Sequence, residues 1–195
     1  VRFISNKSSG KQGFELAKSL SKKGFETTLI SGPTSLQVDK SINFIEVETA
    51  DEMFKAAQNN LPADVAIFSA AVADFKVKDQ KEKKIKKNDF INLNLEKNID
   101  ILNYVSNHNS QRPKLVIGFA AETNNIINNA QKKLIEKNCD WIIVNDVSDQ
   151  NIGFDSDFNE VTICRKDKKN DEKLSMKKKS EISDEIVERV INQLN

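Results

Sequence analysis

Three runs of apolar residues without polar alternation constrain the fold of this chain most. They cover residues 64–71, 115–121 and 140–144, and each has the length of a strand rather than of a long helix. A strand without alternation must be covered on both of its faces, which is typical of a parallel sheet. Segments with apolar residues at helical spacing lie between these runs. Because strands then alternate with helices, right-handed crossovers should connect the parallel strands.

The remaining elements follow from local signals. The Thr49 hydroxyl and the Glu52 carboxylate form a capping box, which predicts a helix over residues 52–59. Further helices are expected over residues 14–23, closed by Gly24, over 98–107, capped by Asn98, over 125–137, and after Ser183 as the last cap. Strands are expected at residues 2–5, 27–30, 42–47 and 91–95, with a hairpin of residues 161–165 and 173–176.

The expected fold class is α/β: a Rossmann-like, mostly parallel sheet with helices on both faces, plus a β-hairpin extension. A chain of 195 residues can bury the core of one such domain, which we place over residues 1–195. The net charge of +1 argues against a nucleic-acid partner, and no apolar run approaches the ~20 residues of a membrane span. Cys139 and Cys164 have no CxxC spacing and no nearby histidine, so we expect buried, reduced thiols in a cytoplasmic protein.

Ligands bind to sheets of this kind beyond the carboxyl ends of the parallel strands. That rule selects the polar or glycine-bearing junctions at residues 5–13, 31–35, 70–75, 120–125 and 145–148. In the first junction, the segment from Ser8 to Gly13 precedes a helix whose free N–H groups could hold an anion. It lacks the first glycine of GxGxxG and the GK[ST] of a P-loop, so an anion site and a plain tight turn are equally good interpretations.

Other junctions carry charged or aromatic candidates. Asp74 follows a run of small residues and could bind a ligand or a cation, or simply cap a turn. The lysine-rich segment 76–88 could close over a triphosphate as a flap or remain a solvated loop. Phe119 could stack on a base or lie in the core. Lys133 and Lys137 lie one helical turn apart, where they could reach phosphates or face water.

The single histidine limits the possible chemistry. His108 lies in a polar stretch, so we expect a surface residue and no Ser–His–Asp or Cys–His catalytic set. No metal-ligand spacing is present in the sequence. A cation such as Mg²⁺ would therefore arrive with a phosphate-bearing substrate.

Nine short motifs follow one another along nearly the whole chain. They are VRFISN at residues 1–6, SSG at 8–10, SGP at 31–33, AAVAD at 70–74, KIKK at 84–87, KNIDIL at 97–102, GFAAETN at 118–124, NDVS at 145–148, and GF at 153–154 followed by SD at 156–157 and NEV at 159–161. One such motif would be a weak signal, but nine in register are specific. In this order they resemble the phosphopantothenoylcysteine synthetases, which form the synthetase half of the bacterial bifunctional coenzyme A biosynthesis proteins.

The resemblance implies a reaction. Members of this family join 4'-phosphopantothenate to L-cysteine. The carboxylate attacks the α-phosphate of CTP to give an acyl-cytidylate and pyrophosphate, and the cysteine amine then displaces CMP. Bacterial members of this type use CTP, whereas eukaryotic relatives use ATP. The family is dimeric with its sites near the subunit interface, so we expect a homodimer that uses Mg²⁺ with its nucleotide.

The resemblance also implies roles for residues. Asn6 would contact the acyl intermediate, Lys84 would act on the phosphates from the flap, and Arg2 matches an arginine that the family needs near the site. The substrate-binding loop would be Ser8, Ser9 and Gly10. The CTP contacts would fall on Phe68, Ser69, Ala70, Asp74, Lys84, Ile99, Asp100, Ile101, Leu102, Phe119, Lys133 and Lys137.

The sequence departs from the family pattern in two ways. Ile99 stands where the family usually has proline. In the family, a first strand with a TAGPT-type loop precedes the position of Val1, and bifunctional members also carry a flavin-dependent decarboxylase half. We therefore expect this chain to be the synthetase portion of a longer protein.

Two other functions fit the same fold. An NAD(P)-dependent short-chain-type oxidoreductase would share the glycine-bearing first loop, but it needs a Tyr-x-x-x-Lys pair. Tyr104, the only tyrosine, is followed by His108 at that spacing. A non-catalytic nucleotide-binding module is the second alternative, and it would not need Asn6, Asp74 and Lys84 together.

Overall fold

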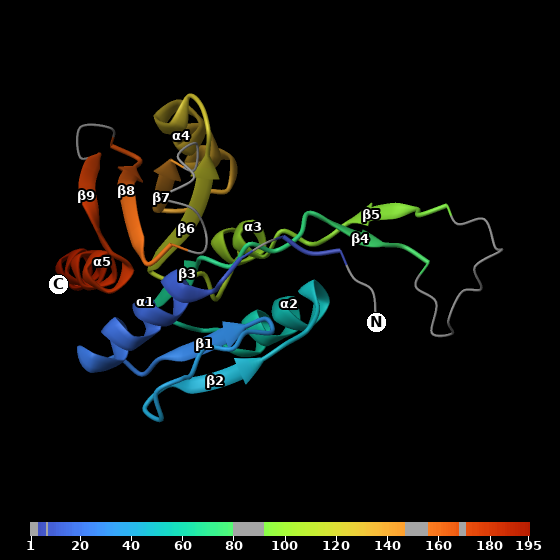
Figure 1. The fold of residues 1–195 in the computed structure, drawn as a ribbon, viewed down its shortest axis with the longest axis horizontal. Coiled ribbons are helices and arrows are strands. Elements are labelled where there is room, and N and C mark those ends of the chain that lie inside the picture. The colour runs from blue at the N-terminus through green and yellow to red at the C-terminus, as the bar shows by residue number, and fades with distance from the viewer. Residues whose placement is uncertain (1–3, 7, 80–91, 147–155, 168–170) are drawn as a thin grey trace.

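The computed structural model describes residues 4–6, 8–79, 92–146, 156–167 and 171–195 (Figure 1). Helices and strands alternate over most of the chain. Their order is α1 (Lys11–Lys22), β1 (Thr28–Ser31), β2 (Asn43–Glu46), α2 (Ala50–Asn59), β3 (Val65–Phe68), β4 (Phe75–Val77), β5 (Leu95–Lys97), α3 (Ile101–Ser106), β6 (Leu115–Glu122), α4 (Ile126–Glu136), β7 (Trp141–Asp146), β8 (Phe158–Arg165), β9 (Glu172–Lys178) and α5 (Lys179–Leu194).

The main sheet has the strand order β3-β6-β7-β8-β9. Its first three strands are parallel, with Phe68 opposite Gly118 and Ala120 opposite Val144. Strands β8 and β9 add to β7 in the antiparallel sense, and they form the hairpin that the sequence predicts. The predicted α/β class with a mostly parallel sheet and a hairpin extension is thereby confirmed.

A second parallel pair, β1 and β2, lies beside the main sheet and is not hydrogen-bonded to it within the described part of the chain. Helix α1 contacts β1 and packs against α5, so it lies between this pair and the rest of the fold (Figure 1). The parallel strands therefore belong to two sheets.

Both faces of the main sheet are covered, as the unalternating runs require. Leu115 and Ile117 of β6 pack in one cluster with residues of α1 and α5. Val116 and Ala120 of the same strand pack in another with residues of α4. Successive residues of a strand point to opposite faces, so β6 supplies side chains to both clusters. Because neither face meets water, the strand can be apolar at successive positions.

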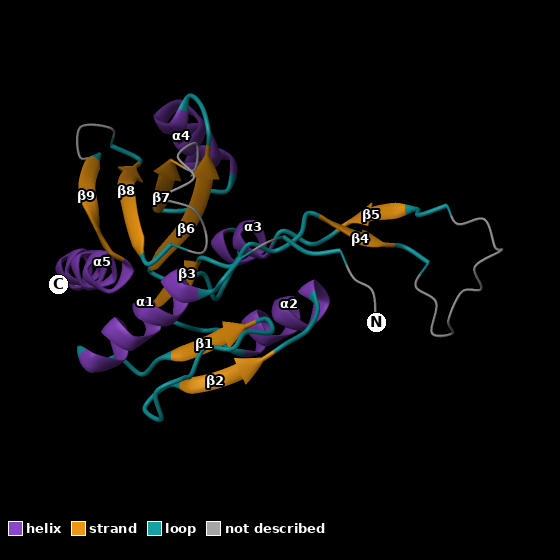
Figure 2. Ribbon diagram, in the orientation of Figure 1, coloured by secondary structure: helices purple, strands orange, loops and turns teal. Residues whose placement is uncertain are grey.

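Strands β4 and β5 form a narrow antiparallel arm that extends away from the body of the protein (Figure 2). One face of the arm carries Phe75, Val77 and Leu95 together with Lys97, and Phe75 and Leu95 are exposed. On the other face, Lys76 donates to Asp51 of α2 at 2.7 Å, which ties the base of the arm to the body.

Several local predictions are confirmed. The Thr49–Glu52 capping box is present, with the Glu52 amide donating to Thr49 Oγ1 at 3.1 Å. Gly24 closes the first helix in the left-handed region, at φ 89°. Cys139 and Cys164 are free and buried, and burial raises the pKa of each thiol to about 11.

Other boundaries differ from the prediction. Helix α5 begins at Lys179, and Ser183 lies inside it and donates to the Lys179 carbonyl, so Ser183 is not the cap. Asp100 rather than Asn98 caps α3, because its carboxylate accepts from the Asn103 amide at 2.9 Å.

Two predicted strands also differ. The predicted strand at residues 91–95 becomes β5, which forms only where β4 offers a partner and so starts at Leu95. In the predicted strand at residues 2–5, Ile4 and Ser5 have no regular secondary structure, and the rest lies outside the described residues. In both places, whether a strand forms depends on pairing with another strand, which local propensity does not predict.

Gly118 of β6 gives a test of how closely α3 approaches the main sheet. A Cβ at this position would lie 2.7 Å from Leu102 Cδ2 and 2.8 Å from Ile142 Cδ1. Gly118→Ala should therefore force the packed side chains apart and lower the free energy of unfolding by about 1–3 kcal/mol. Gly32→Ala is the control, because its Cβ would meet nothing closer than the Val47 carbonyl at 3.9 Å. Urea denaturation of both variants measures the difference, and equal stability would contradict the close approach.

Candidate functional site

Several of the predicted site residues lie in segments that contact one another beyond the carboxyl end of β3 and at the end of β6. The first turn of α1 lies directly against the end of β3, since a Cβ on Gly13 would be 2.8 Å from Ser69 Oγ. The segment that follows β3 contacts Asn6 on one side and Asn98 on the other. We call this region, with residues 5–13, 69–74, 98–102 and the end of β6 with α4, the strand-end site.

The first loop meets α1 at Gly10, the N-cap residue, which is in the left-handed region at φ 73°. Gly10 has no side chain with which to cap the helix, and its own amide donates to Ser8 Oγ at 3.4 Å. Ser8 is exposed, and Ser9 and Gly10 are partly exposed. The arrangement fits an anion at the helix N-terminus, and that site stays a prediction.

A buried polar network holds the first turn of α1 in place. Gln12 Nε2 donates to Ser183 Oγ at 2.8 Å, and Asn159 Nδ2 donates to Gln12 Oε1 at 3.1 Å. Ser183 and Asn159 are both buried. The loop that precedes α1 is thus anchored to β8 and α5, which follow much later in the sequence.

Asn6 lies beside the segment after β3. Its Nδ2 donates to the Val72 carbonyl at 3.2 Å, and its side chain is exposed. From the other side, Asn98 Nδ2 donates to the Ala73 carbonyl and the Asn98 amide to the Asp74 carbonyl, both at 2.8 Å. These bonds fix the backbone of the segment, while the Asp74 carboxylate stays exposed.

Asp100 and Lys137, both predicted to contact CTP, form an ion pair with each other. Lys137 Nζ of α4 donates to Asp100 Oδ2 at the N-terminus of α3. Ile101 is buried, Leu102 packs beneath β6 at Gly118, and Ile99 is exposed. Only Asp100 and Lys137 of this group therefore present charge.

Lys133 is the second predicted lysine of α4, and it also pairs with a carboxylate. Its Nζ lies 2.7 Å from Glu122 Oε1, and Asn129 Nδ2 donates to Glu122 Oε2 at 2.9 Å. Burial alone would raise the pKa of Glu122, but hydrogen bonds from Lys133 and Asn129 hold that pKa below its ordinary value. Glu122 is therefore ionised at neutral pH.

Phe119 does not share a face with these lysines. It is partly buried and packs against the cluster that contains α1 and α5, whereas α4 covers the opposite face of the sheet. Phe68 packs on the α4 side. A ligand that touched both Phe119 and Lys133 would have to lie across the end of β6.

Arg2, Lys84 and the rest of the predicted flap at residues 80–88 lie outside the described residues. The histidine is partly buried rather than fully on the surface. His108 Nδ1 accepts from the Gln111 amide at 3.1 Å, and its ring meets that of Tyr104. No group of three or more His, Cys, Asp or Glu residues in the described ranges is placed to hold a metal ion.

The model of the family described as "DNA/pantothenate metabolism flavoprotein C-terminal domain" matches residues 1–194. The chain belongs to this family. The chain is also similar to the coenzyme A biosynthesis bifunctional protein CoaBC of Haemophilus influenzae, with 41% identity over 195 residues. The match covers 99% of the chain and 48% of that relative, so the chain spans about half the length of the curated protein.

Solved structures agree with the family assignment. The C-terminal domain of a CoaBC protein superposes with a TM-score of 0.79 at 35% identity, covering 100% of the chain and 87% of that domain. A Cab2 mutant, H337A, in complex with phosphopantothenate-cysteine superposes with a TM-score of 0.74 at 14% identity, covering 100% of the chain and 82% of that protein. At that identity the second structure supports the fold alone.

Glu122 and Asn129 are site residues that sequence reasoning missed in this family member. A signal for them exists, because Asn129, Lys133 and Lys137 recur every four residues and therefore form one stripe on α4. Glu122 lies within the GFAAETN motif, but its partners become visible only when α4 folds back over the end of β6.

No helix among the described residues is long and apolar enough to cross a membrane.

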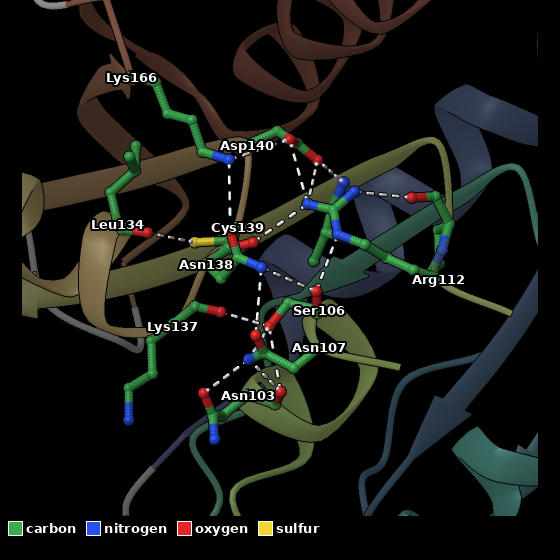
Figure 3. Close-up of polar contacts among 12 residues, drawn as sticks. Asn103, Ser106, Asn107, Arg112, Leu134, Lys137, Asn138, Cys139, Asp140 and Lys166 are labelled. Atoms are coloured by element: carbon green, nitrogen blue, oxygen red, sulfur yellow. Dashed lines mark hydrogen bonds and ion pairs between the residues drawn. The ribbon is translucent and has the colours of Figure 1, made fainter. Parts of the chain in front are cut away.

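A network around Arg112 holds the C-terminal end of α4 and so the position of Lys137 (Figure 3). The Arg112 guanidinium donates to the Ser106 carbonyl at 2.8 Å, to the Asn138 carbonyl at 3.1 Å and to both oxygens of Asp140 at 3.0 and 3.1 Å. Ser106 Oγ in turn donates to the Lys137 carbonyl. The end of α3, the end of α4 and the start of β7 are thereby joined at one guanidinium.

Arg112→Lys tests this network. A lysine keeps the charge but cannot present the planar fork, so carbonyls of α3 and α4 lose their donor, and unfolding should become easier by about 1–3 kcal/mol. The matched control is Lys114→Gln, which removes an ion pair of Lys114 with Asp64 whose side chains are 76% and 70% exposed. Because both side chains are solvated, that pair should contribute little to stability. Thermal and urea unfolding measure both, and a larger loss in the control would refute the network's role.

Proposed function

We propose that this chain joins 4'-phosphopantothenate to L-cysteine with CTP as the activating nucleotide, in coenzyme A biosynthesis. The carboxylate would attack the α-phosphate to form an acyl-cytidylate and release pyrophosphate, and the cysteine amine would then displace CMP. Family membership supports the reaction class, because the Haemophilus influenzae relative is a coenzyme A biosynthesis protein. The Cab2 mutant that was solved in complex with phosphopantothenate-cysteine shares the fold of this chain.

The observation that carries the proposal is the convergence of predicted residues in the strand-end site. Asn6, Asp100 and Lys137 come from segments far apart in sequence. Asn6 and Asn98 both contact the segment after β3, and Asp100, two residues after Asn98, binds the Lys137 side chain. Such a cluster of an amide, carboxylates and ammonium groups suits a ligand that carries both phosphates and hydrogen-bonding groups.

The residues would share the work as follows. Lys133 and Lys137 would bind phosphate oxygens of CTP, and the fixed backbone at residues 70–74 would read the nucleoside. The Asn6 amide would hydrogen-bond the polarised acyl carbonyl without competing as a nucleophile. The loop of Ser8, Ser9 and Gly10, with the N-terminus of α1, would hold an anionic group of the substrate. Lys84 and Arg2 would supply further positive charge.

Mg²⁺ is part of the proposal as a partner of the triphosphate. Its chemistry would be to neutralise charge on the reacting phosphate. Because the described residues place no three His, Cys, Asp or Glu side chains together, most of its ligands would be phosphate oxygens and water.

A homodimer is also part of the proposal, and the arm supports it. Five exposed apolar side chains lie on the arm or in the segments at its base: Ile4, Phe75, Leu93, Leu95 and Ile99. A two-stranded ribbon is marginally stable in water, so a second copy of the chain would stabilise the arm by covering this face. Ile99 belongs to the strand-end site, which agrees with a site near the subunit interface.

The oxidoreductase alternative loses support from the placement of Tyr104. The tyrosine hydroxyl accepts from Gln58 Nε2 at 2.9 Å, and its ring packs edge-on against Phe54 at 4.8 Å between ring centroids. Tyr104 therefore joins α2 to α3 as a packing residue.

An assay of pyrophosphate release tests the proposed reaction directly. With CTP, 4'-phosphopantothenate, cysteine and Mg²⁺, we expect release of pyrophosphate and CMP in equal amounts with formation of phosphopantothenoylcysteine. Omitting cysteine should leave pyrophosphate release limited to a single turnover. The control replaces CTP with ATP. A protein that makes no product with any nucleotide would refute the ligase proposal, and product with ATP alone would refute the choice of CTP.

Asn6→Asp separates the two half-reactions. A carboxylate cannot donate to the polarised acyl carbonyl, so acyl-cytidylate should accumulate while amide formation slows by about 10²-fold, the usual effect of losing one such donor. Rapid-quench analysis with labelled CTP measures both steps. Asn109→Asp, at an exposed turn away from the strand-end site, should behave as wild type. Equal slowing of both half-reactions would remove Asn6 from the second step.

A further inference from the structure

Both lysines of the α4 stripe, Lys133 and Lys137, are already held by carboxylates in this structure, but the two carboxylates differ. Asp100 is a helix cap, and its side chain is 39% exposed. Glu122 ends β6, and its side chain is only 14% exposed. A largely buried carboxylate is costly unless its oxygens accept hydrogen bonds. For Glu122, both hydrogen-bond donors are side chains of α4. Glu122 is therefore a fixed point on the sheet against which one face of α4 is set.

The geometry points to Glu122 as a positioning residue for Lys133: its carboxylate directs the lysine ammonium toward the phosphate-binding part of the strand-end site. This inference rests on the proposed function, because it assumes that Lys133 binds phosphate. Glu122 itself would not touch the nucleotide. Glu122 would act through Lys133. Asn129 would keep the second oxygen of the Glu122 carboxylate in place.

The contacts explain how a negative group can help to bind a negative ligand. An ammonium has three N–H donors, and the Glu122 carboxylate takes one of them at 2.7 Å. The Lys133 side chain is 43% exposed, so the remaining donors face solvent at the end of β6. The flexible lysine stem would otherwise lose rotamer freedom on binding phosphate, and the ion pair has already restricted it.

The charge of Glu122 opposes phosphate only weakly. Each of its carboxylate oxygens accepts a hydrogen bond, one of them from a full positive charge, and the group is mostly covered by α4. Asn129 Nδ2 also donates to the Asn124 carbonyl at 3.0 Å, so the donor that holds Glu122 is itself tied to the loop between β6 and α4. Orientation of Lys133 should therefore outweigh repulsion by Glu122.

A double-mutant cycle tests the inference. Glu122→Gln keeps the shape and an acceptor oxygen but removes the ion pair, and we expect it to weaken CTP binding about fivefold to tenfold. The KM for CTP should rise by the same factor, while the KM values for phosphopantothenate and cysteine stay unchanged. In a Lys133→Met background, Glu122→Gln should have no further effect, because the two residues act as a unit. Isothermal titration calorimetry with CTP, and with inorganic pyrophosphate as a simpler probe, gives the affinities.

The matched control is Glu136→Gln. Glu136 lies on α4 and pairs with Lys132 at 3.7 Å, but both side chains are more than half exposed, so this variant should bind CTP as wild type does. Circular dichroism confirms that each variant is folded. Two results would overturn the positioning role. One is a loss of CTP affinity in the double mutant that equals the product of the losses in the two single mutants. The other is a Glu122→Gln variant that binds CTP as tightly as wild type or more tightly.

The binding and turnover measurements separate this inference from the proposed function. If the wild-type protein binds CTP but forms no product, the ligase proposal is refuted. The CTP affinities of the wild type and the variants still decide the role of Glu122. A wild-type protein that binds neither CTP nor pyrophosphate overturns the positioning role as well, since Lys133 would then have no phosphate to meet.

Discussion

The burial of β6 on both faces is the constraint on which the rest of the structure depends. Its residues alternate between two clusters, one with α1 and α5 and the other with α4. A strand with no polar face cannot lie at a surface, so helices must pack on both sides of it. One of those helices, α1, brings the first loop to the end of β3, and the other, α4, places Lys133 at Glu122, the last residue of β6. The chemistry of the strand-end site is thus a result of how this strand is covered.

The sequence was sufficient to predict the class of fold because the signals for it are local. Unalternating runs identify β3, β6 and β7, and the Thr49–Glu52 capping box identifies the start of α2. The elements that could not be predicted depend on partners elsewhere. Strand β5 starts where β4 ends its pairing, and α5 begins four residues before the serine that local rules select as its cap.

The candidate site could be predicted in the same partial way. Strand-end position and motif order selected Asn6, Asp100 and Lys137, and the structure places each of them in contact with another part of the site. Glu122 was not selected, because a carboxylate at the end of a strand has no meaning until the helix that supplies its donors is in place. Phe119 was assigned to the ligand, but alternation along β6 turns it toward the opposite face from the lysines. Spacing along the chain identifies the stripe on α4, whereas only folding reveals what the stripe faces.

The bond between Gln12 and Ser183 has a consequence for the order in which the protein folds. These residues are 171 positions apart, and Ser19 and Asp184 repeat the connection at a separation of 165. During synthesis from the N-terminus, α1 therefore emerges from the ribosome long before its partners in α5 exist. Contacts of such high sequence separation form late, because the loop that they close is long. The loop that precedes α1 is consequently among the last parts to be fixed, and a nascent chain that stops before α5 would hold the residues of the candidate site without holding their arrangement.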